Sequence, residues 1–165
     1  EVMRFEQYRE QFAFLRDNGI TTRTDMAAFT ARTEETLANL MKQRTVLNVR
    51  RKRRRALYTA LADAEALAPV KELYEAGLSG METEFAQYMD AVAALEQCGV
   101  PREGLIQEKA ELYDRLAELN RQIRAERRKL ALCRKTQNSL PRMEQEIDKA
   151  EARESEVRTN EHRRR

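Results

Sequence analysis

A run of six basic residues, from position 50 to position 55, lies near the middle of a stretch whose apolar spacing predicts one long helix from about residue 24 to about residue 67. No acidic residue occurs between positions 36 and 62, and Lys42 and Arg44 add two more positive charges to this window. Consecutive helical residues are rotated by about 100°, so six of them surround the helix axis. Because burying an unpaired guanidinium group is costly, no apolar core can enclose this run.

The apolar stripe of the same helix predicts where a partner helix packs. Its members are Leu37, Leu40, Leu47, Tyr58 and Leu61. Continued at a period of 3.5, the stripe passes through Arg44, Arg51 and Arg54. We therefore expect one of three arrangements at the basic run: the seam opens, acidic side chains meet it, or an external polyanion lies against it.

The composition predicts an all-α fold. The chain of 165 residues is 41% hydrophobic and 36% charged but only 6% aromatic, which is typical of long helices with a narrow apolar seam. We expect a single elongated module over residues 1–165, a helical bundle or antiparallel coiled-coil-like assembly of about five helices, two of them long. The expected helices span residues 3–18, 24–67, 69–76, 80–98, 101–138 and 141–158. Because the chain opens at Glu1 without an initiator Met, we expect it to be a piece of a larger protein.

Glycines, prolines and a serine predict where these helices begin and end. The pattern of an apolar residue followed four and five positions later by Gly and another apolar residue occurs at Gly19, Gly77 and Gly99, which predicts three Schellman stops. Pro69 predicts the end or a kink of the long basic helix. Residues 79–82, Ser-Gly-Met-Glu, form a capping-box pattern. Residues 138–141, ending in Pro141, predict a break or hairpin turn.

The second long helix has a heptad seam of its own. Its expected members are Leu105, Leu112, Leu116, Leu119, Ile123, Leu130, Cys133 and Leu140. Lys109, Glu126 and Gln137 are polar members of the same seam, which favours a bundle or an antiparallel pair over a parallel zipper. The sequence leaves open whether the two long helices run parallel or antiparallel.

Charged residues are segregated elsewhere as well. Residues 121–135 form a second basic block, and residues 144–156 form an acidic tail. If the chain reverses near Pro141, the tail lies along this block and neutralises it. The first run has no such neighbour in sequence, and five acidic residues, Glu103, Glu108, Glu111, Asp114 and Glu118, reach it only by tertiary packing.

The first run is therefore the main candidate for contacts with nucleic-acid phosphates, through counterion release and without sequence preference. The candidate residues are Arg44, Arg50, Arg51, Lys52, Arg53, Arg54 and Arg55 in and near the first run. Arg127, Arg128 and Lys129 of the second block are weaker candidates, because the acidic tail is available to neutralise them. The alternative is a solvated helix whose cations form ion pairs within the protein, each worth only about 0.5 kcal/mol.

Nothing in the sequence indicates catalysis or a cofactor. His162 is the single histidine, so no histidine cluster can hold a metal ion. Tyr58, Cys98 and Cys133 lie at seam or helix-end positions, and we interpret them as structural residues. Two cysteines are too few for a disulfide framework and fit a reducing cytoplasm. No apolar run approaches the length of a membrane span.

Four segments resemble the C-terminal helical region of relaxases, the mobilisation nucleases of bacterial conjugative elements. They are FAFLRDNGI (12–20), TVLNVRRKRRR (45–55), LYEAGLSGM (73–81) and LNRQIRAERRKL (119–130), within a similarity over about residues 5–158. The resemblance implies a parent protein that nicks and carries DNA at a transfer origin. The family uses a tyrosine nucleophile and a histidine-bound metal in an N-terminal domain. This chain lacks such a histidine set, so no catalytic residue is carried over.

These observations together lead us to expect a non-catalytic helical module of a relaxase in the bacterial cytoplasm. It would contact DNA without sequence preference, with no cofactor or metal, and its further partners would be proteins of the transfer machinery or a second copy. The alternative is a structural coiled-coil module for protein docking or oligomerisation that binds no nucleic acid.

Overall fold

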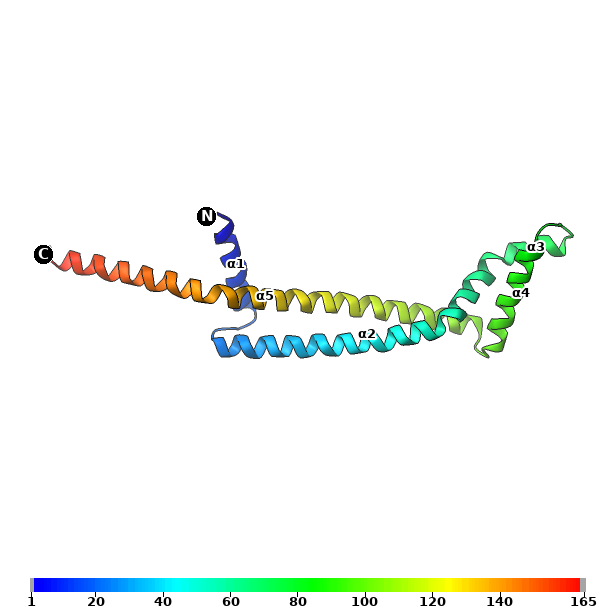
Figure 1. Ribbon diagram of the computed structural model, residues 1–165, viewed down its shortest axis with the longest axis horizontal. Helices are drawn as coiled ribbons and strands as arrows, with labels where there is room; N and C mark the ends of the chain where they lie inside the picture. The colour runs from blue at the N-terminus through cyan, green and yellow to red at the C-terminus, as the bar shows by residue number, and fades with distance from the viewer. Residues whose placement is uncertain (1, 164–165) are drawn as a thin grey trace. The chain divides into compact units, whose positions relative to one another are not determined.

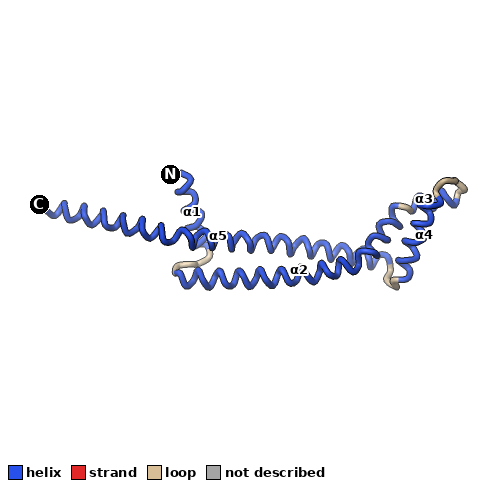
Figure 2. The backbone as a smooth tube through the Cα atoms, in the orientation of Figure 1, coloured by secondary structure: helices blue, strands red, loops and turns tan. Residues whose placement is uncertain are grey.

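The computed structural model describes residues 2–163, apart from the side chains of residues 2–7 and of most residues after 142. Over these residues the chain forms five helices and no strand, which confirms the all-α prediction (Figures 1 and 2). The helices are α1 (Val2–Asp17), α2 (Arg23–Ala66), α3 (Ala68–Glu75), α4 (Glu82–Gln97) and α5 (Arg102–Arg163). Two of them are long, α2 with 44 residues and α5 with 62. None of these helices carries an apolar stretch that would span a lipid bilayer.

The chain divides into two compact units, Glu1–Ala38 with Arg124–Arg165, and Asn39–Ile123. Helices α2 and α5 contribute a segment to each unit. In the 39–123 unit, Arg44 of α2 contacts Asn120 of α5, whereas Tyr58, later in α2, contacts Glu108, earlier in α5. In the other unit, Arg23 lies beside Leu140 and Thr36, later in α2, lies beside Glu126, so the α2 and α5 segments run antiparallel in both units. The orientation that the sequence left open is thus antiparallel within each unit. That the two units act as a single module stays a prediction.

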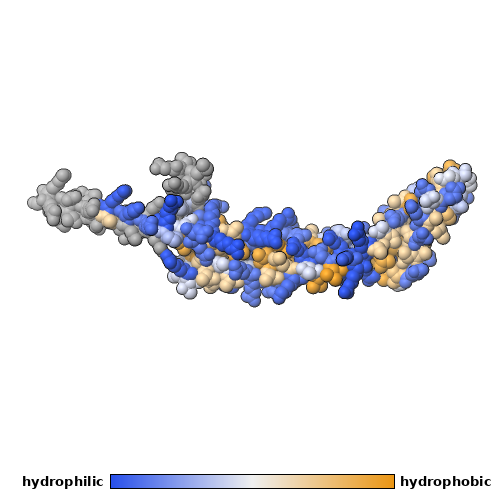
Figure 3. All heavy atoms as spheres, viewed as in Figure 1, coloured by the Kyte–Doolittle hydropathy of each residue, from blue (hydrophilic) through white to orange (hydrophobic). Residues whose placement is uncertain are grey.

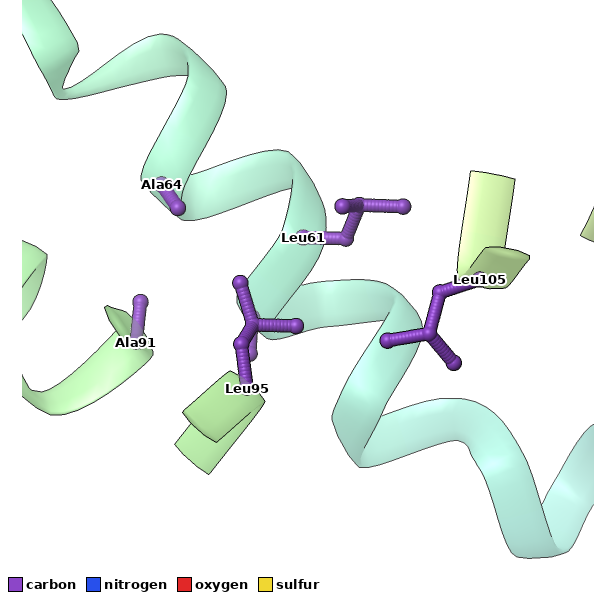
Figure 4. Close-up of a cluster of buried hydrophobic side chains, with 6 residues drawn as sticks. Leu61, Ala64, Ala91, Leu95 and Leu105 are labelled. Atoms are coloured by element: carbon purple, nitrogen blue, oxygen red, sulfur yellow. The ribbon is translucent and has the colours of Figure 1, made fainter. Parts of the chain in front are cut away.

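Three helices share one apolar cluster in the 39–123 unit (Figure 4). The buried members are Ala60, Leu61 and Ala64 from α2, Ala91 and Leu95 from α4, and Leu105 from α5. Next to it, Tyr58 packs against Leu112 and Leu116. α3 lies along α4, where the ring of Tyr74 stacks on Phe85 with 4.1 Å between centroids. This packing fixes α2 against α5 and so determines how the basic run is presented.

A smaller cluster holds the other unit together. Phe14, Ile20, Met26 and Cys133 are buried there, and Phe14 meets Phe29 edge to face at 5.6 Å. The α5 seam predicted from the heptad pattern is confirmed in both units: Leu140 is half-buried, and its other seven apolar members are buried.

The N-terminus of α2 is closed by a reciprocal pair of hydrogen bonds. The backbone N–H of Asp25 donates to the Thr22 hydroxyl at 3.0 Å, and the N–H of Thr22 donates to the Asp25 carboxylate at 2.9 Å. The hydroxyl bond from Thr22 and further bonds from Thr21 hold the pKa of Asp25 below its usual value. The expected stop at Gly19 is also present, since Gly19 has φ 63° and the N–H of Ile20 donates to the Leu15 carbonyl at 2.9 Å.

Two expected helix boundaries are wrong. The break at Pro141 does not occur, because α5 continues through it. A proline removes one backbone hydrogen bond and costs about 3 kcal/mol, but it does not reverse a chain by itself, and no glycine follows Gly104. The capping box at Ser79 does not form either. Gly80 has φ 90° and turns the chain after Ser79, so α4 begins at Glu82, whose carboxylate accepts a bond from the Gly80 N–H at 3.2 Å.

Two glycines near the start of α5 predict opposite effects of the same substitution. Gly99 has φ 66°, so Gly99→Ala places a side chain in a left-handed conformation and is expected to lower stability by about 1 kcal/mol. Gly104 is helical and an added Cβ meets only Val100 at 3.4 Å, so Gly104→Ala is expected to raise stability by about 0.5 kcal/mol. Urea unfolding of the two variants measures both changes, and a stabilised Gly99→Ala would contradict this account of the helix stop.

Candidate nucleic-acid interface

The packing of α2 against α5 divides the basic run into two groups. Arg50 and Arg54 turn toward α5, where both meet the carboxylate of Glu108. The remaining four, Arg51, Lys52, Arg53 and Arg55, are exposed and form no ion pair with any residue that the structure describes. Of the three arrangements expected at the seam, an acidic partner is therefore present, but only for part of the run.

Glu108 is the centre of the paired group. Its Oε1 accepts a hydrogen bond from the Tyr58 hydroxyl at 2.8 Å and lies 3.2 Å from Nε of Arg54, while its Oε2 lies 3.6 Å from an Nη atom of Arg50. The Glu108 side chain is only 18% exposed, so these contacts are partly shielded from water. One carboxylate thus balances part of the charge of two guanidinium groups and orients both along α5.

Tyr58 is a buried structural residue in this arrangement. Burial, followed by the hydrogen bond to Glu108 and its negative charge, raises the pKa of Tyr58 to about 12. The phenol is therefore protonated at neutral pH and donates to Glu108. The ammonium of Lys109 lies 6.0 Å from the centre of the Tyr58 ring. This environment stabilises the protonated phenol and disfavours the phenolate that a nucleophilic tyrosine requires.

Tyr58→Phe tests this hydrogen bond by its pH dependence. At neutral pH the variant is expected to lose about 1 kcal/mol of stability, the usual contribution of a hydrogen bond to a charged acceptor that keeps other partners. Because the folded-state pKa of Tyr58 is raised from 10 to about 12, its stabilising effect is complete below pH 10 and is lost as the pH rises toward 12. Urea unfolding followed by circular dichroism should show the two proteins converging over that interval. A difference that stays constant to pH 12 would contradict the assignment.

Three of these exposed cations border a hollow between α2 and α5. Arg51, Lys52 and Arg55 of α2 and Lys109 of α5 supply four positive charges, together with Asn48, Tyr58, Thr59, Ala62 and Tyr113. We call this feature the basic hollow. No carboxylate lines it, and its volume is about 690 Å³. Within the basic hollow, the four positive charges therefore meet no carboxylate.

A second hollow shares two cations, Lys52 and Arg55, with the basic hollow. It also contains Arg53, Asp63 and Asp90, so carboxylates there offset part of the positive charge. Arg44 lies beside α5 and donates to the Asn120 side chain at 3.4 Å. These positions make Arg44 and Arg53 less suited to phosphate contact than the four cations of the basic hollow.

Three cations of the second basic block form ion pairs within the unit of residues 1–38 and 124–165. Lys129 pairs with Glu126 at 2.7 Å, Arg134 with Glu34 of α2 at 3.7 Å, and Lys135 with Glu10 of α1 at 3.3 Å. The tail predicted to neutralise this block does not fold back, because α5 continues past Pro141; the tail's acidic side chains lie outside the described residues. Arg127 and Arg128 are exposed, and their role in binding stays a prediction.

Sequence reasoning missed Lys109 and Tyr113 as members of the site. Lys109 is a polar member of the seam predicted for α5, but its place beside the basic run depends on the register of the antiparallel helices. Tyr113 is 46% exposed at the edge of the basic hollow, and no local pattern distinguishes it from a core tyrosine.

Among the described residues, no group of three or more histidine, cysteine or acidic side chains is arranged to hold a metal ion. Burial raises the pKa of the Cys133 thiol, which therefore stays protonated at neutral pH.

No protein-family model, curated protein or solved structure matches the chain.

Proposed function

We propose that this chain is a non-catalytic helical module that binds DNA without sequence preference through the basic hollow. The observation that carries the proposal is the grouping of Arg51, Lys52, Arg55 and Lys109 on one side of a helix pair, with no carboxylate among the lining residues. In agreement with its sequence resemblance, we further propose that the module belongs to a mobilisation relaxase and holds DNA during conjugative transfer.

Electrostatics supports a polyanion as the ligand. Each cation that neutralises a phosphate releases a condensed counterion, and this entropy gain supplies most of the affinity of non-specific binding. The four side chains come from two helices that pack against each other, so their spacing is maintained by the core and not by a flexible loop. A strand of phosphates passing over the hollow meets cations on both sides.

The same geometry supports binding that is independent of sequence. Base readout in the major groove requires side chains that form paired hydrogen bonds with base edges, from an element lying in the groove. Arg51 and Arg55 could pair with guanine only from an element lying in the groove, but in the basic hollow they line a recess between α2 and α5. Such a patch positions a backbone and does not read bases.

Fluorescence anisotropy with two labelled duplexes of unrelated sequence and equal length tests the proposal. At about 50 mM salt we expect binding of both duplexes with dissociation constants within about threefold of each other. A protein that binds neither duplex under these conditions would overturn the proposal and favour a structural docking module. A strong preference for one duplex would overturn the claim of sequence-independent contact.

A further inference from the structure

The end of the 39–123 unit carries the opposite charge to the basic run. Residues 63–97, which comprise the end of α2, α3, α4 and their connections, contain eight carboxylates and a single cation, Lys71. We call this segment the acidic hairpin. Its acidic members are Asp63, Glu65, Glu72, Glu75, Glu82, Glu84, Asp90 and Glu96, and all are exposed. Within the described residues the only ion pair of the hairpin joins Lys71 to Glu75 at 4.0 Å.

The acidic hairpin also exposes apolar side chains. Leu73, Tyr74, Leu78 and Met89 are between 36% and 48% exposed. Residues of high hydropathy cover much of the visible face of α3 and α4 in Figure 3. Large apolar side chains grouped on a surface indicate an interaction site. Because the surrounding charge is negative, a complementary partner surface carries apolar side chains among cations. Nucleic acid, in contrast, is repelled.

The chain itself contains a surface of that kind on α2. Lys42, Val46, Val49 and Arg53 are spaced by three or four residues and therefore share one face of the helix. Val46 is 66% exposed and Val49 is 46% exposed. The same spacing continues through Ala56 to Ala60 and Ala64, which are the residues that α4 covers. The exposed stripe is thus the unoccupied continuation of a face that already packs against the hairpin of its own chain.

We propose that the acidic hairpin of one copy docks on the stripe formed by Lys42, Val46, Val49 and Arg53 of a second copy. Charge complementarity selects this occupant, because the hairpin is acidic and the stripe is flanked by cations without an acidic residue between positions 36 and 62. Val46 and Val49 then become covered in the way that Ala60 and Ala64 are covered within one chain. The two charged residues of the stripe, Lys42 and Arg53, do not line the basic hollow. Self-association and DNA binding therefore use different side chains and can fail separately.

Sedimentation velocity of the full chain over a range of concentrations tests the proposal. We expect reversible association at about 50 mM salt that weakens by more than about tenfold at 0.5 M salt, because screening removes much of the attraction between opposite charges. Zero-length carbodiimide cross-linking of mixed ¹⁴N and ¹⁵N copies should join hairpin carboxylates to Lys42 between copies. A protein that stays monomeric at every concentration would overturn the proposal.

Variants with reversed charge identify the two surfaces. The hairpin variant Glu72→Lys, Glu75→Lys, Glu84→Lys and the stripe variant Lys42→Glu, Arg53→Glu should each associate with themselves at least tenfold more weakly. An equimolar mixture of the two should associate again, because each then offers one surface complementary to the other. Glu35→Lys, Glu103→Lys, Asp114→Lys is the control, with the same charge change at exposed positions outside the hairpin.

Val46→Gln with Val49→Gln provides an independent test, since both side chains are exposed and their replacement by uncharged polar residues should leave the fold and the net charge intact. It too should lose association. Association that survives in the hairpin variant and in the valine variant would overturn the proposal. The valine variant should keep full DNA affinity, so loss of association with DNA binding retained separates this inference from the proposed function.

Discussion

Replacing the four cations of the basic hollow by glutamine is expected to lower the affinity for DNA by about three orders of magnitude at 0.1 M salt. The variant is Arg51→Gln, Lys52→Gln, Arg55→Gln, Lys109→Gln. Each phosphate contact contributes about 0.9 to the dependence of log affinity on log salt, so four contacts account for a loss of this size. Fluorescence anisotropy with a labelled duplex measures it directly.

A matched control separates the placement of charge from its amount. Arg9→Gln, Arg32→Gln, Arg102→Gln, Arg142→Gln removes four exposed cations elsewhere, so both variants change the formal net charge from +3 to the same value. The control is expected to lose less than about tenfold in affinity. If both variants lose affinity equally, the protein binds DNA through its overall charge, and the basic hollow has no special role.

Removing Glu108 is expected to lower stability and raise DNA affinity at the same time. Glu108→Ala deletes the acceptor of the Tyr58 hydroxyl and the partner of two guanidinium groups, Arg50 and Arg54. A fully buried pair would cost more, but Arg50 and Arg54 are 56% and 35% exposed, so we expect a loss of about 2 kcal/mol in the free energy of unfolding. DNA binding should tighten severalfold, because one negative charge is removed and two cations are released.

Two further variants divide this effect into its parts. Glu108→Gln keeps an oxygen for Tyr58 but removes the charge, and is expected to cost about 1 kcal/mol. Glu111→Ala removes a nearby exposed carboxylate that accepts a hydrogen bond from the Gln107 side chain, and should change stability by less than about 0.5 kcal/mol. Urea unfolding of all three variants provides the comparison. A Glu108→Ala protein as stable as the unaltered chain would show that the ion pairs do not hold Arg50 and Arg54 in place.

The helical seams could be predicted from sequence because each depends only on local spacing. Leu105, Leu119 and Cys133 lie at the interval of an amphipathic helix, and each is buried. The stop at Gly19 was predictable for the same reason, since the apolar residue that folds back is only five positions from its contact. Features set within a few helical turns are therefore the ones that the sequence determines most directly.

The pairing of the basic run was not predictable in this way. Any of five acidic residues of α5 could form ion pairs with the basic run. Which one does so depends on the register of the antiparallel helices, and this register brings Glu108 to Arg50 and Arg54. That register depends on the apolar cluster that joins Leu61 and Leu95 to Leu105, residues far apart in sequence. For the same reason the sequence could not show that Lys109 completes the hollow or that Arg44 lies beside Asn120.

One of the two wrong helix boundaries, the break at Pro141, has a related cause. Pro141 alone does not reverse the chain, because a reversal also needs residues that adopt turn conformations, and the sequence after Gly104 contains no glycine. The acidic tail of residues 144–156 therefore does not fold back onto the second basic block, contrary to what the sequence had led us to expect. The block's partners Glu10 and Glu34 come from α1 and α2, which tertiary packing brings to α5.

The salt dependence of DNA affinity tests the central claim most directly, because its slope reports the number of phosphates that the protein neutralises. With four cations in the basic hollow, log affinity against log salt should fall with a slope of about −3.6 for the unaltered chain and close to zero for the variant with four glutamines. A slope near zero for the unaltered chain, or an unchanged slope in the variant, would contradict the assignment of the basic hollow as a phosphate-binding surface.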